Sequence, residues 1–325
     1  MAEIIRIHET GGPEVLRHET VEVGAPGPGE ALIRQHAIGL NFIDTYFRSG
    51  LYPAAQLPFT PGNEGAGEVL AVGAGVSEVS VGDRVAYAGP IGAYASERVL
   101  PAATLVKLPD AISYETGAAM MLKGMTAQYL LRQTFCIEAG QTILFHAAAG
   151  GVGLIACQWA KSLGATVIGT VGSEAKADLA RANGCDHVIN YREEDFAARV
   201  REITDGAGCH VVYDGVGKDT FPASLECLRP RGMWVTFGNA SGPVPSLDLL
   251  LLSQKGSLFV TRPTLFHYIA TRPELEATAG DLMQVVADGT VAIAINQTYP
   301  LHEAAQAHRD LESRKTTGTT VLIPD

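Results

Sequence analysis

The 325-residue sequence predicts an α/β protein, with a doubly wound parallel sheet in one domain and a second domain rich in β-strands. Three observations support this. The length exceeds what a single hydrophobic core usually supports. The first third reads as short strands broken by glycine and proline. After about residue 125, apolar strand-like runs alternate with helical patterns, which is typical of βαβ units.

The strands of the first third are short and are separated by loop-forming residues. Stretches such as 24–29 (GAPGPG) interrupt regular structure because glycine admits positive φ and proline lacks an amide donor. The expected strands span 3–8, 31–35, 67–72 and 83–87.

The second part repeats a strand and a helix. Val152, Ile155, Trp159 and Leu163 recur every three or four residues, so they share one face of a helix that would pack on the sheet. The expected strands span 142–146, 166–170, 187–190, 211–214, 234–237 and 258–261.

Beyond residue 265 the alternation ends. Helices are expected over 274–286 and 302–311, and strand-like runs over 291–295 and 319–323. Local sequence does not reveal which domain this last part joins.

Composition excludes several kinds of partner. The net charge of -11 makes broad attraction to nucleic acid or to an anionic membrane unfavourable. No apolar run approaches the roughly 20 residues that span a bilayer, and the N-terminus carries no secretory pattern, so a cytoplasmic location is expected. Five cysteines without a CxxC pair indicate reduced, mostly buried thiols.

The strongest chemical signal is a glycine-rich turn between a strand and a helix. Its pattern Ala148-x-Gly150-x-x-Gly153 is a variant of the dinucleotide fingerprint. Missing side chains let the backbone approach a pyrophosphate, which free amides and the helix dipole then stabilise. A tight structural turn is the alternative, but the flanking strand and helix favour a nicotinamide cofactor.

The next strand indicates which cofactor. NAD sites usually carry an acid at the end of this strand to bind the ribose, and none occurs here. Ser173 and Lys176 instead suit the additional phosphate of NADP. Ser173 could alternatively cap the next helix, and Lys176 could simply be solvated.

Several motifs together resemble the zinc-free quinone oxidoreductases of the medium-chain dehydrogenase/reductase superfamily, over nearly the whole chain. They are 11–16 (GGPEVL), 39–46 (GLNFIDTY), 48–53 (RSGLYP), 82–85 (GDRV), 123–127 (KGMTA) and the fingerprint. The resemblance implies a GroES-like catalytic domain over 1–125, a Rossmann NADPH-binding domain over 126–264, a return to the catalytic domain over 265–325, and a homodimer. It further implies hydride transfer from NADPH to a quinone.

Zinc-dependent relatives place a cysteine in the segment 41–44 and a histidine before the glutamate of the segment 62–67. Both ligands are absent here, and Glu64 cannot assemble a zinc site alone. No metal is therefore expected.

The resemblance also assigns site residues. Asn41, Lys123 and Thr126 would line the cofactor cleft, and Gly150, Gly151, Val152 and Gly153 would form the pyrophosphate turn. Ser173, Lys176 and Tyr191 would hold the adenosine phosphate, with Arg314 as a further candidate that could instead be an exposed helix-end cation. Phe237, Asn239, Phe259 and Thr261 end predicted Rossmann strands, where cofactor contacts normally gather, although the apolar ones could instead be core residues. Tyr46 and Tyr52 flank the predicted cleft and could stack on or hydrogen-bond a quinone seated near Asn41, although either tyrosine could instead simply bury its ring.

No catalytic acid, base or nucleophile is assigned, since the cofactor carries the chemistry. Two alternatives stay open. One is NADPH-dependent reduction of the double bond of an enal or enone, because such compounds accept hydride as quinones do. The other is a non-enzymatic role in cofactor sensing or RNA binding, which the acidic composition disfavours.

Overall fold

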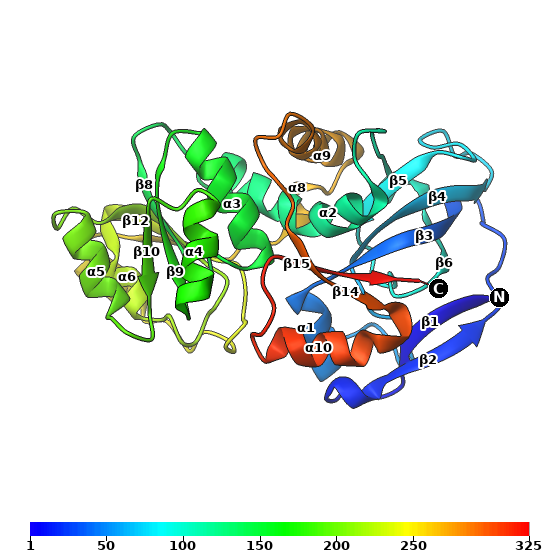
Figure 1. The fold of residues 1–325 in the computed structure, drawn as a ribbon, viewed down its shortest axis with the longest axis horizontal. Helices are drawn as coiled ribbons and strands as arrows, with labels where there is room; N and C mark the ends of the chain where they lie inside the picture. Colours follow the sequence, from blue (N-terminus) through cyan, green and yellow to red (C-terminus); the bar gives the residue numbers. More distant parts are fainter. Residues whose placement is uncertain (325) are drawn as a thin grey trace. The chain divides into compact units, whose positions relative to one another are not determined.

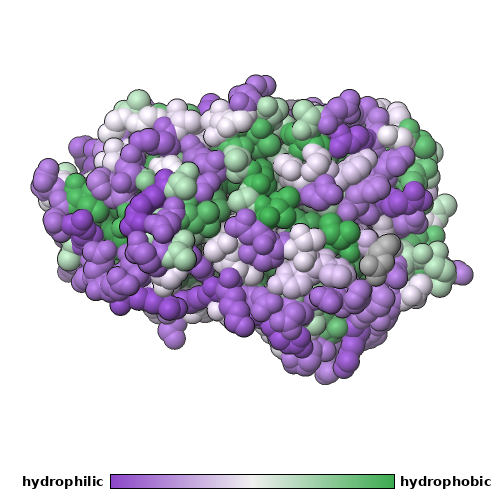
Figure 2. Space-filling model, in the orientation of Figure 1, coloured by the Kyte–Doolittle hydropathy of each residue, from purple (hydrophilic) through white to green (hydrophobic). Residues whose placement is uncertain are grey.

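The computed structural model describes residues 1–324, which form two compact units. Of the described residues, unit 1 comprises 1–125, 269–287 and 293–324, and unit 2 comprises 126–268 and 288–292. Among the described residues, no helix is long and apolar enough to cross a membrane. The face seen in Figure 2 carries mostly hydrophilic residues, interrupted by smaller hydrophobic areas.

Unit 1 is built on a largely antiparallel sheet of seven strands. Its order is β14-β15-β3-β4-β5-β7, and β6 pairs with β3. These strands span Ile295–Pro300, Thr319–Ile323, Glu30–Leu40, Glu64–Val72, Arg84–Ala88 and Val106–Lys107 in that order, with β6 at Glu97–Pro101. The antiparallel pair β1 (Ala2–Ile7) and β2 (Leu16–Val21) lies separately. β15 pairs with β3, so the chain's last strand completes the sheet begun by its first third (Figure 1).

Helices and short turns complete unit 1. They are α1 (Phe42–Ser49), α9 (Arg272–Ala287), α10 (Ala304–Glu312) and the short 3-10 turns Pro13–Val15, Ala102–Thr104 and Leu301–Glu303. Helix α2 (Tyr114–Tyr129) begins in unit 1 and ends in unit 2, where a π-helical turn follows at Leu130–Thr134.

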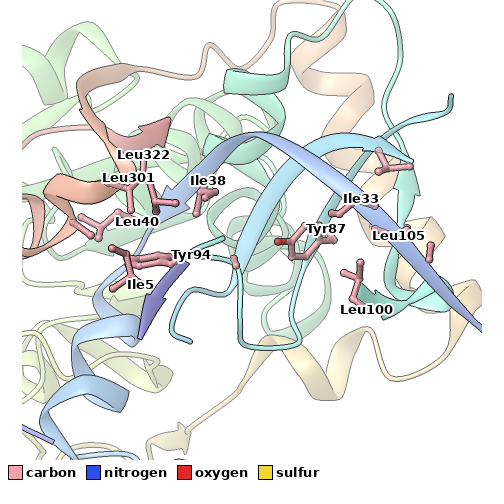
Figure 3. Packing of buried hydrophobic residues seen from close by; sticks show 14 of the residues in the cluster. Ile5, Ile33, Ile38, Leu40, Tyr87, Tyr94, Leu100, Leu105, Leu301 and Leu322 are labelled. Atoms are coloured by element: carbon pink, nitrogen blue, oxygen red, sulfur yellow. The ribbon is translucent and has the colours of Figure 1, made fainter. Parts of the chain in front are cut away.

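The main apolar cluster of unit 1 contains two fully buried tyrosines. Ile5, Ile38 and Leu40 pack in one cluster with the rings of Tyr87 and Tyr94, both fully buried (Figure 3). Because each tyrosine also carries a hydroxyl, each needs a polar partner inside this core.

Unit 2 is a six-stranded parallel sheet of order β10-β9-β8-β11-β12-β13. The strands span His187–Asn190, Thr166–Val171, Thr142–Phe145, Cys209–Asp214, Leu228–Thr236 and Phe259–Thr261. The helices are α3 (Gly151–Ser162), α4 (Glu174–Ala182), α5 (Phe196–Ile203), α6 (Ala223–Glu226), α7 (Leu249–Gln254) and α8 (Leu265–Tyr268). Figure 1 shows α3 and α4 on one side of this sheet and α5 and α6 on the other, the arrangement of a doubly wound fold.

The predicted fold class is confirmed. The expected strand over 291–295 is wrong, because the strand begins only at Ile295. The backbone amide and carbonyl of Ala292 bond to the side chain of Gln158, so they take no part in a ladder. Four of the five cysteines are buried and free, as expected, whereas Cys136 is exposed.

Candidate cofactor and acceptor sites

The glycine-rich turn lies between β8 and α3. β8 ends at Phe145, Ala147 adopts a positive φ of 55°, and α3 begins at Gly151. A Cβ on Gly153 would overlap the carbonyl oxygen of Ala147 and would lie 2.6 Å from that of Ala148. The turn is therefore too tight for a side chain, and the first-turn amides of α3 point away from the helix with no partner inside it.

A buried polar chain supports this turn from the sheet side. His146 Nδ1 lies 2.9 Å from the Thr170 hydroxyl, and its Nε2 lies 3.0 Å from the Ser224 hydroxyl. The Ser224 hydroxyl donates to the Asp214 carboxylate at 3.1 Å. Burial lowers the pKa of His146 although Asp214 opposes it, so the ring is neutral at pH 7. The chain joins the ends of β9, β8 and β11, and the amide of Ala148 donates to the Thr170 carbonyl.

The loop after β9 has the features that a phosphate site needs. Ser173 is the residue before the first turn of α4, yet its side chain makes no capping hydrogen bond. A Cβ on Gly172 would lie 2.5 Å from the Tyr191 hydroxyl, so that hydroxyl lies directly over the loop. Lys176 lies in the first turn of α4 and is half-buried. Glu174, the acid of this loop, is paired with Arg181 at 2.9 Å.

These residues fit NADPH. The turn offers backbone amides for a pyrophosphate, and the loop offers two hydroxyls and an ammonium for a phosphate. Residues 150–153, Ser173, Lys176 and Tyr191 would hold the cofactor, which supplies a hydride when bound.

The four residues at the ends of β12 and β13 lie in different surroundings. The Phe237 ring lies 5.9 Å from that of Phe145, and a Cβ on Gly215 would approach it to 3.1 Å. Asn239 follows two residues later in the loop after β12. Phe259 and Thr261 belong to the edge strand β13, where the Phe259 side chain is 57% exposed.

In unit 1, Asn41 and Lys123 meet at one buried carboxylate. Glu64 Oε1 forms an ion pair with the Lys123 ammonium and accepts a hydrogen bond from Asn41 Nδ2 at 2.8 Å. Glu64 Oε2 accepts from the amide of Leu122 at 2.6 Å. A Cβ on Gly39 would overlap this carboxylate, so glycine is required there.

A second buried carboxylate lies beside it. Asp44, in the first turn of α1, accepts from the Asn41 amide at 2.9 Å and from Asn63 Nδ2 at 2.7 Å. Asn41 and Asn63 belong to the segments where zinc-dependent relatives carry ligands, and here their amides bind carboxylates. The described residues contain no group of three or more His, Cys, Asp or Glu side chains that could hold a metal ion.

Tyr46 and Tyr52 contact each other. Their ring centroids lie 5.2 Å apart in an edge-to-face arrangement, and the Phe47 ring lies 5.8 Å from Tyr52. Tyr46 is buried, so Tyr52 presents the more accessible face.

Arg314 follows α10 with a φ of 59° and belongs to unit 1, as do both tyrosines. Thr126 is the first residue of unit 2 in α2.

The fold brings together several residues to which the sequence pattern assigns no role. Asp44 and Arg48 lie within the quoted motifs, whereas Tyr94 and His308 lie outside them. Tyr94 and His308 are 214 positions apart, so no local pattern relates them. The aspartate three residues after Asn41 was a usable signal, since this spacing is typical of a helix start.

Two family models match the chain. The family described as "Alcohol dehydrogenase GroES-like domain" matches residues 27–110, and the family described as "Zinc-binding dehydrogenase" matches residues 151–285. The two matches fall on the segments that form the β-rich sheet and the parallel sheet.

The chain is also similar to individual proteins over 98% or more of its length. It is 58% identical to a quinone oxidoreductase of Pseudomonas aeruginosa, with all of both chains covered. It is 48% identical to a 2-haloacrylate reductase of a Burkholderia species, with 98% of each chain covered. A solved structure of Escherichia coli quinone oxidoreductase complexed with NADPH superposes with a TM-score of 0.97 at 51% identity, covering 99% of this chain and 100% of that one. The chain therefore belongs to the quinone oxidoreductase family of the medium-chain dehydrogenase/reductase superfamily.

Proposed function

We propose that this protein is an NADPH-dependent quinone oxidoreductase that works without zinc. The quinone gains a hydride and a proton and leaves as the hydroquinone, while the cofactor is oxidised to NADP⁺. The observation that carries this proposal is the 58% identity to a quinone oxidoreductase over the whole of both chains. The NADPH complex of the E. coli relative supports the cofactor.

The residues have distinct proposed roles. The turn 150–153 would bind the pyrophosphate, and Ser173, Lys176 and Tyr191 would bind the adenosine phosphate, with Arg314 as a further contact. Phe237, Asn239, Phe259 and Thr261 would contact the cofactor from the strand ends, and Lys123 and Thr126 from α2. Asn41, Tyr46 and Tyr52 would orient the flat acceptor. Orientation of two reactants is a large part of the catalysis when the cofactor carries the chemistry.

A substrate panel tests this function. Purified protein should oxidise NADPH in the presence of 1,4-benzoquinone or 1,2-naphthoquinone, with one hydroquinone formed per NADPH. Quinone reduction with NADH alone would contradict the cofactor assignment, and the absence of quinone reduction with either cofactor would contradict the activity. Electron paramagnetic resonance during turnover distinguishes a two-electron product from a released semiquinone.

Direct hydride transfer is the proposed chemistry. NADPH deuterated on the transferred face should give a kinetic isotope effect when hydride transfer limits the rate, and the label should appear on carbon in any enone product. An obligatory covalent adduct between enzyme and acceptor, seen by rapid kinetics, would contradict direct transfer.

Reduction of an activated carbon-carbon double bond is the second candidate. It is favoured by the 48% identity to the 2-haloacrylate reductase. Enones and 2-haloacrylates belong in the same substrate panel. Turnover of these compounds with a higher kcat/KM than any quinone would make this the main activity.

Metal independence has a direct test. Elemental analysis should find less than stoichiometric zinc in active protein, and a chelator should leave the rate unchanged. Zinc whose removal abolishes turnover and whose return restores it would contradict the proposal.

Three broader proposals accompany the function. Segments 1–125 and 265–325 would form the catalytic domain and 126–264 the cofactor domain, which the two compact units support. A homodimer is proposed, and exposed Leu249 and Leu250 offer apolar surface that a partner would cover. A cytoplasmic location suits four buried free thiols and an NADPH-consuming reaction.

The non-enzymatic alternative is a role in cofactor sensing or RNA binding. Salt-dependent RNA binding without NADPH turnover would favour it over the enzymatic function.

A further inference from the structure

A chain of hydrogen bonds runs from the surface of unit 1 to Asp44. It begins at Glu312, whose side chain is 37% exposed and whose two oxygens accept from Arg48 Nη1 at 3.0 Å and Nη2 at 2.6 Å. The Arg48 side chain is buried, and its Nε donates to the Gly11 carbonyl. These bonds hold the Arg48 guanidinium group in one orientation.

The arginine sets the direction of the next bonds. Arg48 Nη1 lies 3.0 Å from His308 Nδ1, and a guanidinium can only donate, so Nδ1 is the acceptor. Burial and the charge of Arg48 lower the pKa of His308 to about 3, so the ring is neutral and carries its hydrogen on Nε2. Nε2 lies 3.0 Å from the Tyr94 hydroxyl, which accepts this hydrogen and donates its own to Asp44 Oδ2 at 3.1 Å.

Asp44 thus receives hydrogen bonds from three donors. They are the Tyr94 hydroxyl, the Asn63 side-chain amide and the Asn41 backbone amide. Each of these donors bonds more strongly to a carboxylate than to a neutral carboxyl group, so all three favour the charged form of Asp44. Reversing the bonds along the chain would place a hydrogen on His308 Nδ1 against an Arg48 hydrogen. The distant arginine therefore keeps the Tyr94 hydroxyl as a donor to Asp44.

We propose that Tyr94 and His308 are positioning residues that hold Asp44 as a carboxylate and, through it, fix the amides of Asn41 and Asn63 for acceptor binding. This inference rests on the proposed function, because Asn41 is a proposed acceptor contact. Loss of the Asp44 charge would weaken its bond to the backbone amide of Asn41, the residue before α1, and would disturb the Asn41 side-chain bond to Glu64. The same helix carries Tyr46.

The other charged groups near the chain act on Asp44 and Tyr94 through space. The positive charge of Lys123 lowers the pKa of Asp44. The negative charges of Asp44 and, to a smaller extent, Glu64 raise the pKa of Tyr94, whereas the positive charge of Arg48 lowers it. Burial is the largest influence on both groups and raises both pKa values. Donors on Asp44 are therefore what keep its charge near neutral pH.

The decisive experiment titrates Asp44 in the cofactor-free protein. Carbon-13 labelling of aspartate carboxyls gives one signal per residue, and Asp44→Asn identifies the signal of Asp44 by its loss. Tyr94→Phe keeps the buried ring and removes one donor, so the midpoint of Asp44 should rise by about one pH unit, a tenfold change in the acid dissociation constant. With cofactor and quinone, the acidic limb of kcat/KM should move by the same amount.

Matched variants separate positioning from general packing. Tyr87→Phe removes an equally buried hydroxyl that donates to Gln35 in the same core, and the Asp44 midpoint should not move. His308→Leu breaks the chain and should raise the midpoint. His308→Gln offers one acceptor and one donor on a single amide and should restore it.

An unchanged Asp44 midpoint in Tyr94→Phe, or an equal shift in Tyr87→Phe, would overturn the inference. If His308→Leu does not fold, the Tyr94→Phe and His308→Gln titrations still decide it. Failure of the parent protein to reduce quinones would refute the proposed function instead, since the cofactor-free titration does not depend on turnover.

Discussion

The Lys123 ammonium is ion-paired with Glu64, a carboxylate with no exposed surface, and the same carboxylate holds the side chain of Asn41. One buried glutamate therefore fixes two residues that come from separate segments of the chain. Removal of either charge would leave the other buried without its partner.

Lys123→Met should lower the free energy of unfolding by about 3 to 5 kcal/mol, because an unpaired buried carboxylate is strongly unfavourable. The double variant Lys123→Met, Glu64→Gln should recover part of this loss, since no unpaired buried charge remains and the glutamine oxygen still accepts from either Asn41 or the Leu122 amide. Urea unfolding of the cofactor-free protein measures both. Lys255→Met, at a solvent-exposed ion pair with Glu226, serves as the control and should cost about 0 to 1 kcal/mol. If Lys123→Met and Lys255→Met lowered the free energy of unfolding equally, the pair of Lys123 with Glu64 would not behave as a buried ion pair.

Asp44 should make the protein less stable as the pH rises from about 4 to 6. Burial raises its pKa from 3.8 to about 6, so in this range the folded protein binds a proton that the unfolded chain has lost. The contribution should be roughly 3 kcal/mol, at about 1.4 kcal/mol per pH unit. It is fully present below pH 4 and absent above pH 6. Chemical unfolding across this range should show the slope in the parent protein and not in Asp44→Asn.

Asp186 provides a control of opposite sign. Burial favours a higher pKa for Asp186, but Lys161 and the Val167 amide lower it overall. Asp186→Asn should therefore remove a contribution that is lost as the pH falls. If Asp44→Asn leaves the slope of the free energy of unfolding between pH 4 and 6 unchanged, Asp44 does not have a raised pKa in the folded protein.

Lys176→Ala should weaken NADPH binding by about 1 to 3 kcal/mol, the value of one charge-assisted hydrogen bond. NADH binding should change little, because NADH lacks the phosphate. Calorimetric titration with each cofactor gives both affinities. Lys161→Ala, in the last turn of α3, should affect neither cofactor. Equal weakening of both cofactors by Lys176→Ala would contradict a phosphate-specific role.

Gly153→Ala should weaken NADPH and NADH alike, by tenfold or more, a factor that equals about 1.4 kcal/mol. The new Cβ would overlap backbone carbonyl oxygens of the turn, so the pyrophosphate amides would have to move. Gly280 is also helical, in α9, and a Cβ there meets nothing within 4 Å. Gly280→Ala should leave cofactor binding unchanged and raise stability by about 0.5 to 1 kcal/mol. A Gly153→Ala protein with parental affinity would remove the turn from the cofactor site.

Tyr52→Leu should raise the KM for quinones about three- to tenfold, since an aromatic contact contributes about 0.5 to 1.5 kcal/mol. Cofactor affinity should stay unchanged. Tyr46→Phe tests the neighbouring hydroxyl without opening a cavity. Tyr114→Leu removes a tyrosine that stacks on His36, and quinone kinetics should not respond. If Tyr52→Leu and Tyr46→Phe leave every quinone unchanged, neither tyrosine contacts the acceptor.

Local pattern was enough to predict the parallel sheet and its glycine turn. The turn residues 150–153 and the helix that follows are contiguous in sequence, so spacing alone identified them. The same holds for the apolar runs that became β8 to β11, because buried parallel strands need little besides apolar side chains. The segment 291–295 is also an apolar run, but it does not form the predicted strand, since Gln158 from a distant helix bonds to the backbone groups of Ala292.

The sequence by itself determined the fold class and the glycine turn, and its motifs indicated the family, because each depends on residues close together in the chain. Only the tertiary structure decided how the buried carboxylates are satisfied. Glu64 meets Lys123 across 59 positions, and Arg48 meets His308 across 260. The charge of a buried group depends on which donors the fold places within hydrogen-bond distance, and no periodicity in the sequence encodes a contact over that separation.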